Sequence, residues 1–261
     1  GARGPRAAVN PLDLVRPDVL APWVVFARLG AAFLLLPGFA ETYVTPRLRL
    51  ATALFSSLLV TGSGLVAPPP LPSEPARLAA LILGEIGIGL AIGVTARFAL
   101  AAVHLAGTLV ATNSGLAAAA LFDPGEATPG TLPGAFLSSA FLALLFTSDA
   151  HHALLRRLVG SYDRLPVGEH LWIADAAELL ARLGSELFAT GLAMAAPLLA
   201  VALLANLALG VLARLVPALQ ILFVALPLQL LLALAALAVS FGASLLLALR
   251  FLERATAWTS G

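Results

Sequence analysis

"LAALILGEIGIGLAIGVTARFALAAVHLAGTLVATNSGLAAAAL", Leu78–Leu121, is one long apolar run. About 20 helical residues cross the hydrocarbon core of a bilayer, so this run is far longer than one crossing requires. Backbone polar groups in hydrocarbon must be paired within their own segment, which predicts a helix. Four glycines give this helix a smooth side where another backbone can approach closely: Gly84, Gly87, Gly89 and Gly93. We therefore expect a helix that tilts, breaks or continues beyond the lipid against protein.

Composition supports the same class of protein. Of the 261 residues, 60% are hydrophobic and only 11% are charged, whereas soluble domains carry about 25% charged residues. Lysine and cysteine are absent, which excludes disulfides, thiolate zinc sites, cysteine nucleophiles and Schiff-base lysines. A net charge of +1 argues against nucleic-acid binding. The chain is predicted to be an integral membrane protein.

The apolar segments number six: Val19–Ala40, Leu48–Ala67, Leu78–Leu121, Leu132–Val159, Ala176–Leu215 and Ala218–Leu252. We predict an all-α membrane protein of about six long, kinked hydrophobic helices arranged as hairpins. Pro197, Pro217 and Pro227 are the predicted helix kinks, since proline inside a helix removes a hydrogen bond. Arginines cluster in alternate connecting segments, which favours both termini in the cytoplasm.

An ionisable side chain inside a membrane-spanning segment costs free energy, so each such residue is first considered as functional. In this sequence they are Arg28, Glu85, Arg97, His104, Asp149, His151, His152, Arg182 and Glu186. Glu178, Arg182 and Glu186 are spaced four apart and share one helix face. We interpret them as a ladder of buried ion pairs; a gate or relay is the alternative.

Asp149, His151 and His152 suggest a metal site or an acid–base pair. His104 and His170, the other histidines, belong to no metal-binding motif. We therefore interpret the group as a segment end with hydrogen-bonding side chains, and we predict no metal, cofactor or catalytic residue.

Four stretches in this order carry a family resemblance: Arg28–Leu50, Leu121–Pro124, Ser148–Gly168 and Ala208–Leu234. They contain Arg-x-Gly with a later Pro-x-Phe, then Phe-Asp-Pro, then Leu-Pro-x-Gly, then two prolines ten residues apart. Together they resemble the FliR family of flagellar export proteins, called SctT in virulence injectisomes. Asp149-Ala150 stands where the family usually has Asn-Gly.

The resemblance implies a core subunit of the flagellar type III protein export gate in the inner membrane, within the flagellar basal body. Partners would be FliP-like and FliQ-like subunits, FlhB-like and FlhA-like export proteins, unfolded flagellar substrates and membrane lipid, but no nucleic acid. Residues 1–175 would form a FliP-like helical region, and residues 176–261 a FliQ-like hairpin.

The resemblance also implies that the loop after the third segment, about residues 112–132, plugs the closed pore. Its residues would be Asn113, Ser114, Gly115, Leu121, Phe122, Asp123, Pro124, Gly125 and Glu126. Acidic side chains and helix-breaking residues are tolerated in a wet lumen but not in lipid. An ordinary connecting loop is the alternative, and ion leakage after deletion of Gly115–Gly130 would support the plug.

Two other function classes fit some of these features. A proton-coupled small-solute transporter fits kinked helices with buried charges, but it predicts an internal repeat that we do not see. An intramembrane enzyme using Asp149 and His152 would need a second polar motif, and none stands out. We predict that the protein is not an enzyme.

Overall fold

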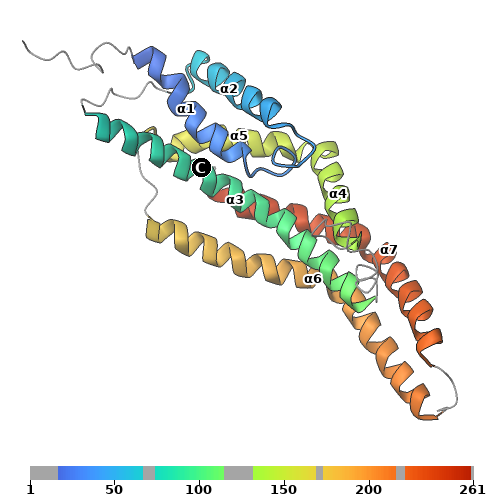
Figure 1. The fold of residues 1–261 in the computed structure, drawn as a ribbon. Helices are drawn as coiled ribbons and strands as arrows, with labels where there is room; N and C mark the ends of the chain where they lie inside the picture. Colours follow the sequence, from blue (N-terminus) through green and yellow to red (C-terminus); the bar gives the residue numbers. More distant parts are fainter. Residues whose placement is uncertain (1–16, 67–73, 115–131, 169–172, 216–220, 260–261) are drawn as a thin grey trace, which may run out of the picture. The chain divides into compact units, whose positions relative to one another are not determined.

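The computed structural model describes residues 17–66, 74–114, 132–168, 173–215 and 221–259. Within these ranges the chain forms seven α-helices, a final 3₁₀ turn and no strand (Figure 1). They are α1 (Pro17–Phe33), α2 (Pro46–Gly62), α3 (Pro75–Asn113), α4 (Leu132–Thr147), α5 (Ala150–Arg164), α6 (Ile173–Leu215), α7 (Ile221–Thr256) and η3 (Ala257–Thr259). The predicted all-α fold is confirmed.

The fourth apolar segment forms two helices rather than one. α4 ends at Thr147 and α5 begins at Ala150. Between them Asp149 has a φ of 57°, in the left-handed region that an α-helix cannot contain. Aspartate tolerates this region better than most residues, because its short polar side chain can bond locally. The predicted apolar segment Leu132–Val159 therefore contains α4 and most of α5 rather than a single straight helix.

The long helices confirm the membrane class. Three are long and apolar enough to cross a membrane: Pro75–Asn113, Asp175–Leu215 and Pro227–Thr259. The pair formed by α4 and α5 passes the same test as one broken span, and Val19–Phe33 is a shorter apolar helix.

The chain divides into two compact units, each assembled from separated segments. Unit 1 contains residues 1–94, 154–178 and 256–261, and unit 2 contains residues 95–153 and 179–255. These units follow spatial contacts, so they do not test the predicted division of the chain near Asp175. That division stays a prediction.

Unit 1 is built on a close crossing of α1 and α3. A Cβ at Gly93 would lie 2.8 Å from the Cβ of Leu35 and 3.0 Å from the carbonyl oxygen of Ala32, so only glycine allows this approach. The second helix, α2, starts with Pro46 at its first position, and the Thr45 hydroxyl accepts a hydrogen bond from Leu48 N–H at 3.4 Å. A mainly apolar cavity of about 560 Å³ is lined by residues of α1 and α2, by Leu34 just after α1, and by Ile86 of α3.

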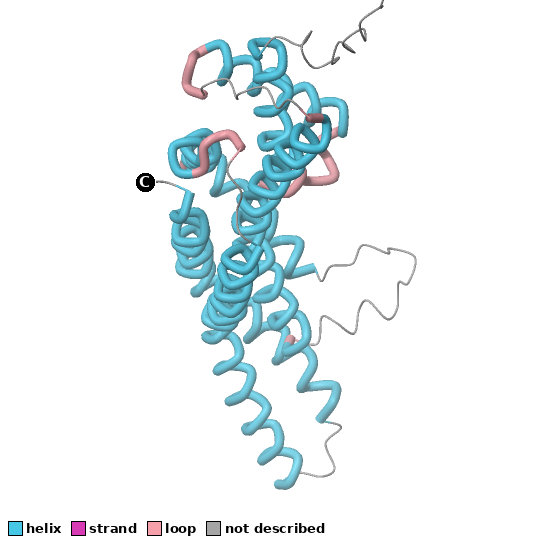
Figure 2. Tube along the Cα trace, turned by 90° about the vertical axis from the view of Figure 1, so that its left-hand side faces the viewer, coloured by secondary structure: helices cyan, strands magenta, loops and turns pink. Residues whose placement is uncertain are grey.

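Unit 2 packs the rest of α3 with α4, α6 and α7. The Asn206 side chain accepts from Gln229 at 2.8 Å, and the Ser244 hydroxyl donates to the Met194 carbonyl at 3.3 Å. These bonds pair Asn206 with Gln229 and the earlier Met194 with the later Ser244, so α6 and α7 run in opposite directions. Figure 2 also shows this antiparallel arrangement. A Cβ at Gly107 would overlap the backbone of Gly134. The backbones of α3 and α4 are therefore in contact at these two glycines. This antiparallel pair agrees with the predicted arrangement of helices as hairpins, and its FliQ-like character stays a prediction.

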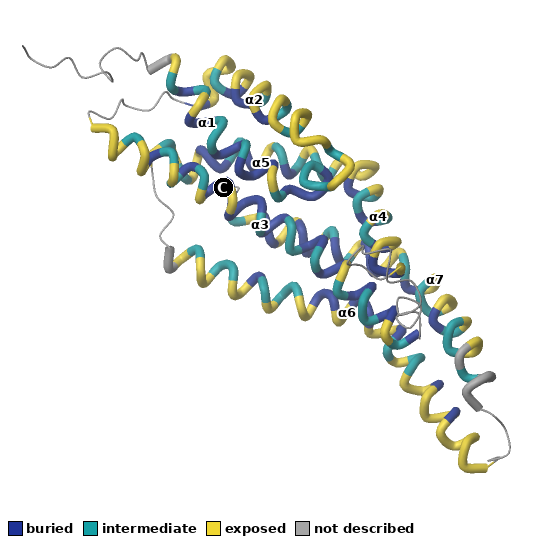
Figure 3. Tube along the Cα trace, viewed as in Figure 1, coloured by how far each residue is buried: buried dark blue, intermediate teal, exposed yellow. Residues whose placement is uncertain are grey.

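Large parts of both long helices remain uncovered within the chain. Figure 3 shows exposed positions along much of α6 and α7. Many of these are large apolar side chains, among them Leu204 at 67%, Leu215 at 72% and Val239 at 89% exposure. Apolar surface on this scale requires lipid or protein against it.

Candidate functional site

The most polar buried site of unit 1 is an ion pair between α1 and α3. Arg28 Nε donates to Glu85 Oε2 at 2.7 Å, and Arg28 Nη2 donates to Glu85 Oε1 at 3.1 Å. Both side chains have 0% exposure. This two-point geometry is the strong form of an arginine–carboxylate pair.

Glycine places the two charges opposite each other. Gly89 lies one helical turn after Glu85, on the same face of α3. A Cβ at Gly89 would overlap the Arg28 carbonyl oxygen, so α1 can cross here only because that atom is absent. The crossing thus brings the Arg28 side chain within reach of Glu85.

Residues of α5 and the turn that follows it complete the site. Arg28 Nη1 donates to Ser161 Oγ at 3.1 Å, and Arg28 Nη2 also donates to the Leu165 carbonyl at 2.8 Å. The Arg28 guanidinium carbon lies 3.9 Å from the centre of the Tyr162 ring, a cation–π contact. The backbone N–H of Gly168 donates to Glu85 Oε1 at 3.3 Å. One arginine and one glutamate therefore join three separate segments of the chain.

This arrangement stabilises structure rather than supporting chemistry. Every nitrogen of the Arg28 guanidinium and both oxygens of the Glu85 carboxylate have a hydrogen-bond partner. A buried ion pair with this many hydrogen bonds holds its segments in register, while losing one partner leaves an isolated buried charge. Sequence reasoning singled out Arg28 and Glu85 separately and missed their pairing, as well as the roles of Ser161 and Tyr162. The Leu-Pro-x-Gly motif was the available signal, because Leu165 and Gly168 are its ends.

The predicted plug loop lies largely outside the described residues. Asn113 is the last residue of α3, and its side-chain amide donates to the Leu109 carbonyl at 2.9 Å. Ser114 is buried and donates to the Ala111 carbonyl at 3.3 Å. Gly115 and Leu121–Glu126 fall in the undescribed range, so their role stays a prediction.

Two of the three predicted kink prolines lie inside helices. Pro197 is within α6 and Pro227 is within α7. Pro217 falls in the undescribed residues between these helices.

The predicted ladder on α6 forms in part and is not buried. Arg182 Nε lies 3.3 Å from Glu186 Oε1, as the four-residue spacing predicts. However, their side chains are 77% and 30% exposed, and Glu178 is also exposed. Packing among the described residues of this chain therefore does not bury these charges, and their burial in an assembly stays a prediction.

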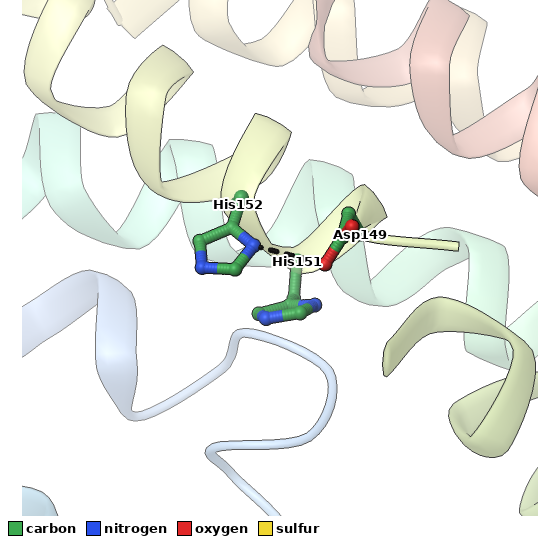
Figure 4. A group of neighbouring side chains, drawn as sticks. All are labelled: Asp149, His151 and His152. Carbon is green, nitrogen blue, oxygen red and sulfur yellow. Dashed lines mark hydrogen bonds and ion pairs between the residues drawn. The ribbon is translucent and has the colours of Figure 1, made fainter. Parts of the chain in front are cut away.

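Asp149, His151 and His152 gather at the break between α4 and α5 (Figure 4). His152 Nδ1 lies 3.2 Å from Asp149 Oδ1, and His151 Nδ1 lies 3.4 Å from the Leu145 carbonyl. These contacts are those expected of a segment end with hydrogen-bonding side chains.

Together, the long apolar helices and the buried ion pair define an all-α integral membrane protein whose crossings depend on glycine. A family model for bacterial export proteins, family 1, matches residues 19–255. The chain belongs to this family of bacterial export proteins.

Individual relatives agree with the family match. The chain is 33% identical to the flagellar biosynthetic protein FliR of Caulobacter vibrioides over 90% of each chain. It is 31% identical to FliR of Escherichia coli over 74% of each chain. It is also 27% identical to the Yop proteins translocation protein T of Yersinia pestis, over 83% of this chain and 84% of the relative. The predicted resemblance to the FliR and SctT family is confirmed, which favours export over small-solute transport.

Proposed function

We propose that this chain is a core subunit of a flagellar type III protein export gate. It would combine with FliP-like and FliQ-like subunits to form a passage for unfolded export substrates. Family membership supports the export role, and the names of the FliR relatives support the flagellar system.

One observation carries the assembly part of the proposal: the apolar helices are too long and too exposed for one chain alone. At about 1.5 Å per residue, the 43 residues of α6 span roughly 65 Å, against a hydrocarbon core of about 30 Å. Its charge-free stretch from Leu187 to Ala213 alone spans about 40 Å. Unless the helix tilts steeply, lipid can contact only part of this apolar surface. Neighbouring subunits would then bury the remaining part.

The hairpin of α6 and α7 supports a FliQ-like role for residues 176–261. Its two antiparallel helices are joined by the Asn206–Gln229 hydrogen bond and by the bond from the Ser244 hydroxyl to the Met194 carbonyl. Such polar contacts are typical of helix association in membranes. Residues 1–175 would then be the FliP-like part, which includes the Arg28–Glu85 site.

The remaining partners follow from the same proposal. FlhB-like and FlhA-like export proteins would act beside this gate, in the inner membrane at the flagellar basal body. Unfolded flagellar proteins would be the cargo rather than ligands of a fixed site.

Single-cysteine cross-linking tests the assembly, because the natural chain has no cysteine. Val239→Cys and Leu204→Cys place thiols on exposed apolar faces, and Ala233→Cys is the matched control because Ala233 is buried within the chain. On co-expression with the FliP-like and FliQ-like subunits, we expect the exposed positions to cross-link to a partner and the control not to. A chain that purifies as a stable monomer from these cells, without cross-links, would refute the proposal.

A further inference from the structure

We propose that Asp149, His151 and His152 form a binding site for a divalent transition-metal ion of the zinc type. Each side chain offers one ligand atom, and the three atoms all lie within 4.8 Å of one another. Figure 4 shows the three side chains brought together where α4 gives way to α5. Neither the family match nor the proposed export function assigns a metal here.

The donor set selects the metal. Two imidazoles and one carboxylate suit zinc, nickel or copper ions, whereas magnesium and calcium prefer oxygen ligands alone. Three protein ligands leave at least one position for water, as in zinc sites that keep an open coordination position.

The distances are close to those of an assembled site. With zinc bonds of about 2.0–2.2 Å, two ligand atoms of a tetrahedral site lie about 3.4 Å apart. His152 Nδ1 and Asp149 Oδ1 are already 3.2 Å apart. The His151 ring lies beside them, with its centroid 4.0 Å from that of His152. No two of the three ligand atoms are more than 4.8 Å apart, so the widest pair exceeds tetrahedral spacing by at most roughly 1.4 Å.

The surroundings orient His151 as a ligand. Its Nδ1 lies 3.4 Å from the Leu145 carbonyl, and in the tautomer that donates from Nδ1 to this carbonyl, Nε2 is the nitrogen left to bind a metal. A backbone carbonyl in this position is the usual outer partner of a metal-binding histidine.

The break in the helix makes the group possible. Asp149 has a φ of 57°, and its carbonyl accepts hydrogen bonds from His152 N–H at 3.0 Å and Ala153 N–H at 3.4 Å. This turn folds the Asp149 side chain back over the start of α5. The metal would lie near the N-terminus of α5, where the positive end of the helix dipole is unfavourable for a cation. The negative charge of the Asp149 carboxylate offsets this positive end.

The group is also accessible to ions. The side chains of His152 and Asp149 are 60% and 76% exposed. Exposed side chains can rotate to close around an ion, and the bound ion would then fix the backbone at the break.

Metal titration of the full chain in detergent micelles tests the proposal. The protein must be purified with a histidine-free tag, since a polyhistidine tag would bind the same ions. We expect one Zn²⁺ per chain by calorimetry, no binding of Mg²⁺, and visible absorption bands of tetrahedral Co²⁺. His151→Ala and His152→Ala should each weaken Zn²⁺ binding at least about tenfold, because loss of even an outer-shell partner costs roughly that much.

His104→Ala is the matched control, because His104 is an exposed histidine of α3 outside the group. A second measurement needs no variant: Zn²⁺ should protect His151 and His152, but not His104, from histidine acylation mapped by mass spectrometry. Absence of Zn²⁺ binding by the folded chain, or equal binding by a His151→Ala/His152→Ala variant with a native elution profile, would overturn the proposal. Neither result would bear on export, which is tested separately by cross-linking.

Discussion

Replacing Glu85 by methionine should destabilise the protein by about 3–5 kcal/mol. The substitution keeps the side-chain volume but leaves the Arg28 cation buried, with only the Ser161 hydroxyl and the Leu165 carbonyl as acceptors. Removing one partner of a buried pair typically costs this amount. Arg28→Met should cost a similar amount, because the Glu85 carboxylate keeps only the Gly168 N–H.

The double variant Arg28→Met/Glu85→Met distinguishes a charge effect from a packing effect. It contains no buried charge, so its cost should be smaller than that of either single variant. What remains is the loss of a few hydrogen bonds from Ser161, Leu165 and Gly168, each worth about 1 kcal/mol. The two single effects should therefore be far from additive.

Unfolding in mixed micelles titrated with sodium dodecyl sulfate measures these free energies, with circular dichroism and tryptophan emission as readouts. The matched control is Glu74→Met, since Glu74 pairs with Arg77 at 3.5 Å but both side chains are more than half exposed. Exposed pairs contribute little, so we expect no measurable change there. If Glu85→Met is no worse than Glu74→Met, or if the double variant costs the sum of the singles, the reasoning is refuted.

Three further predictions follow from the helix contacts. Gly89→Ala should destabilise the chain by about 1–3 kcal/mol through overlap with α1, whereas Gly87→Ala, where a Cβ meets nothing within 4 Å, should be neutral or stabilising in the same unfolding assay. Asn206→Ala should weaken the α6–α7 hairpin by about 1 kcal/mol through loss of its 2.8 Å bond to Gln229; an unchanged midpoint would count against that contact. Arg182→Ala should leave the stability of the isolated chain unchanged, and a large loss in the melting curve would contradict its exposed position.

The sequence alone determined the class of protein and the positions of most helices. A helix satisfies its backbone within its own segment, so a long apolar run such as Leu78–Leu121 predicts its secondary structure without knowledge of its neighbours. The four-residue spacing of Arg182 and Glu186 predicted their ion pair for the same reason, because that contact lies within one turn of one helix. The ordered motifs also identified the family, since they depend only on residue types and their spacing.

Only the tertiary structure decided which distant residues meet and which faces are covered. Arg28 and Glu85 are 57 positions apart, and their pairing depends on where α1 crosses α3 at Gly89, which no local pattern records. The polar residues at Asp149, His151 and His152 indicated a segment end, but the left-handed backbone angle that separates two helices there was not visible in the residue pattern, which contains no proline at this point. The exposure of Arg182 likewise follows from how the helices pack, because helical periodicity defines a face of a helix but not what lies against it.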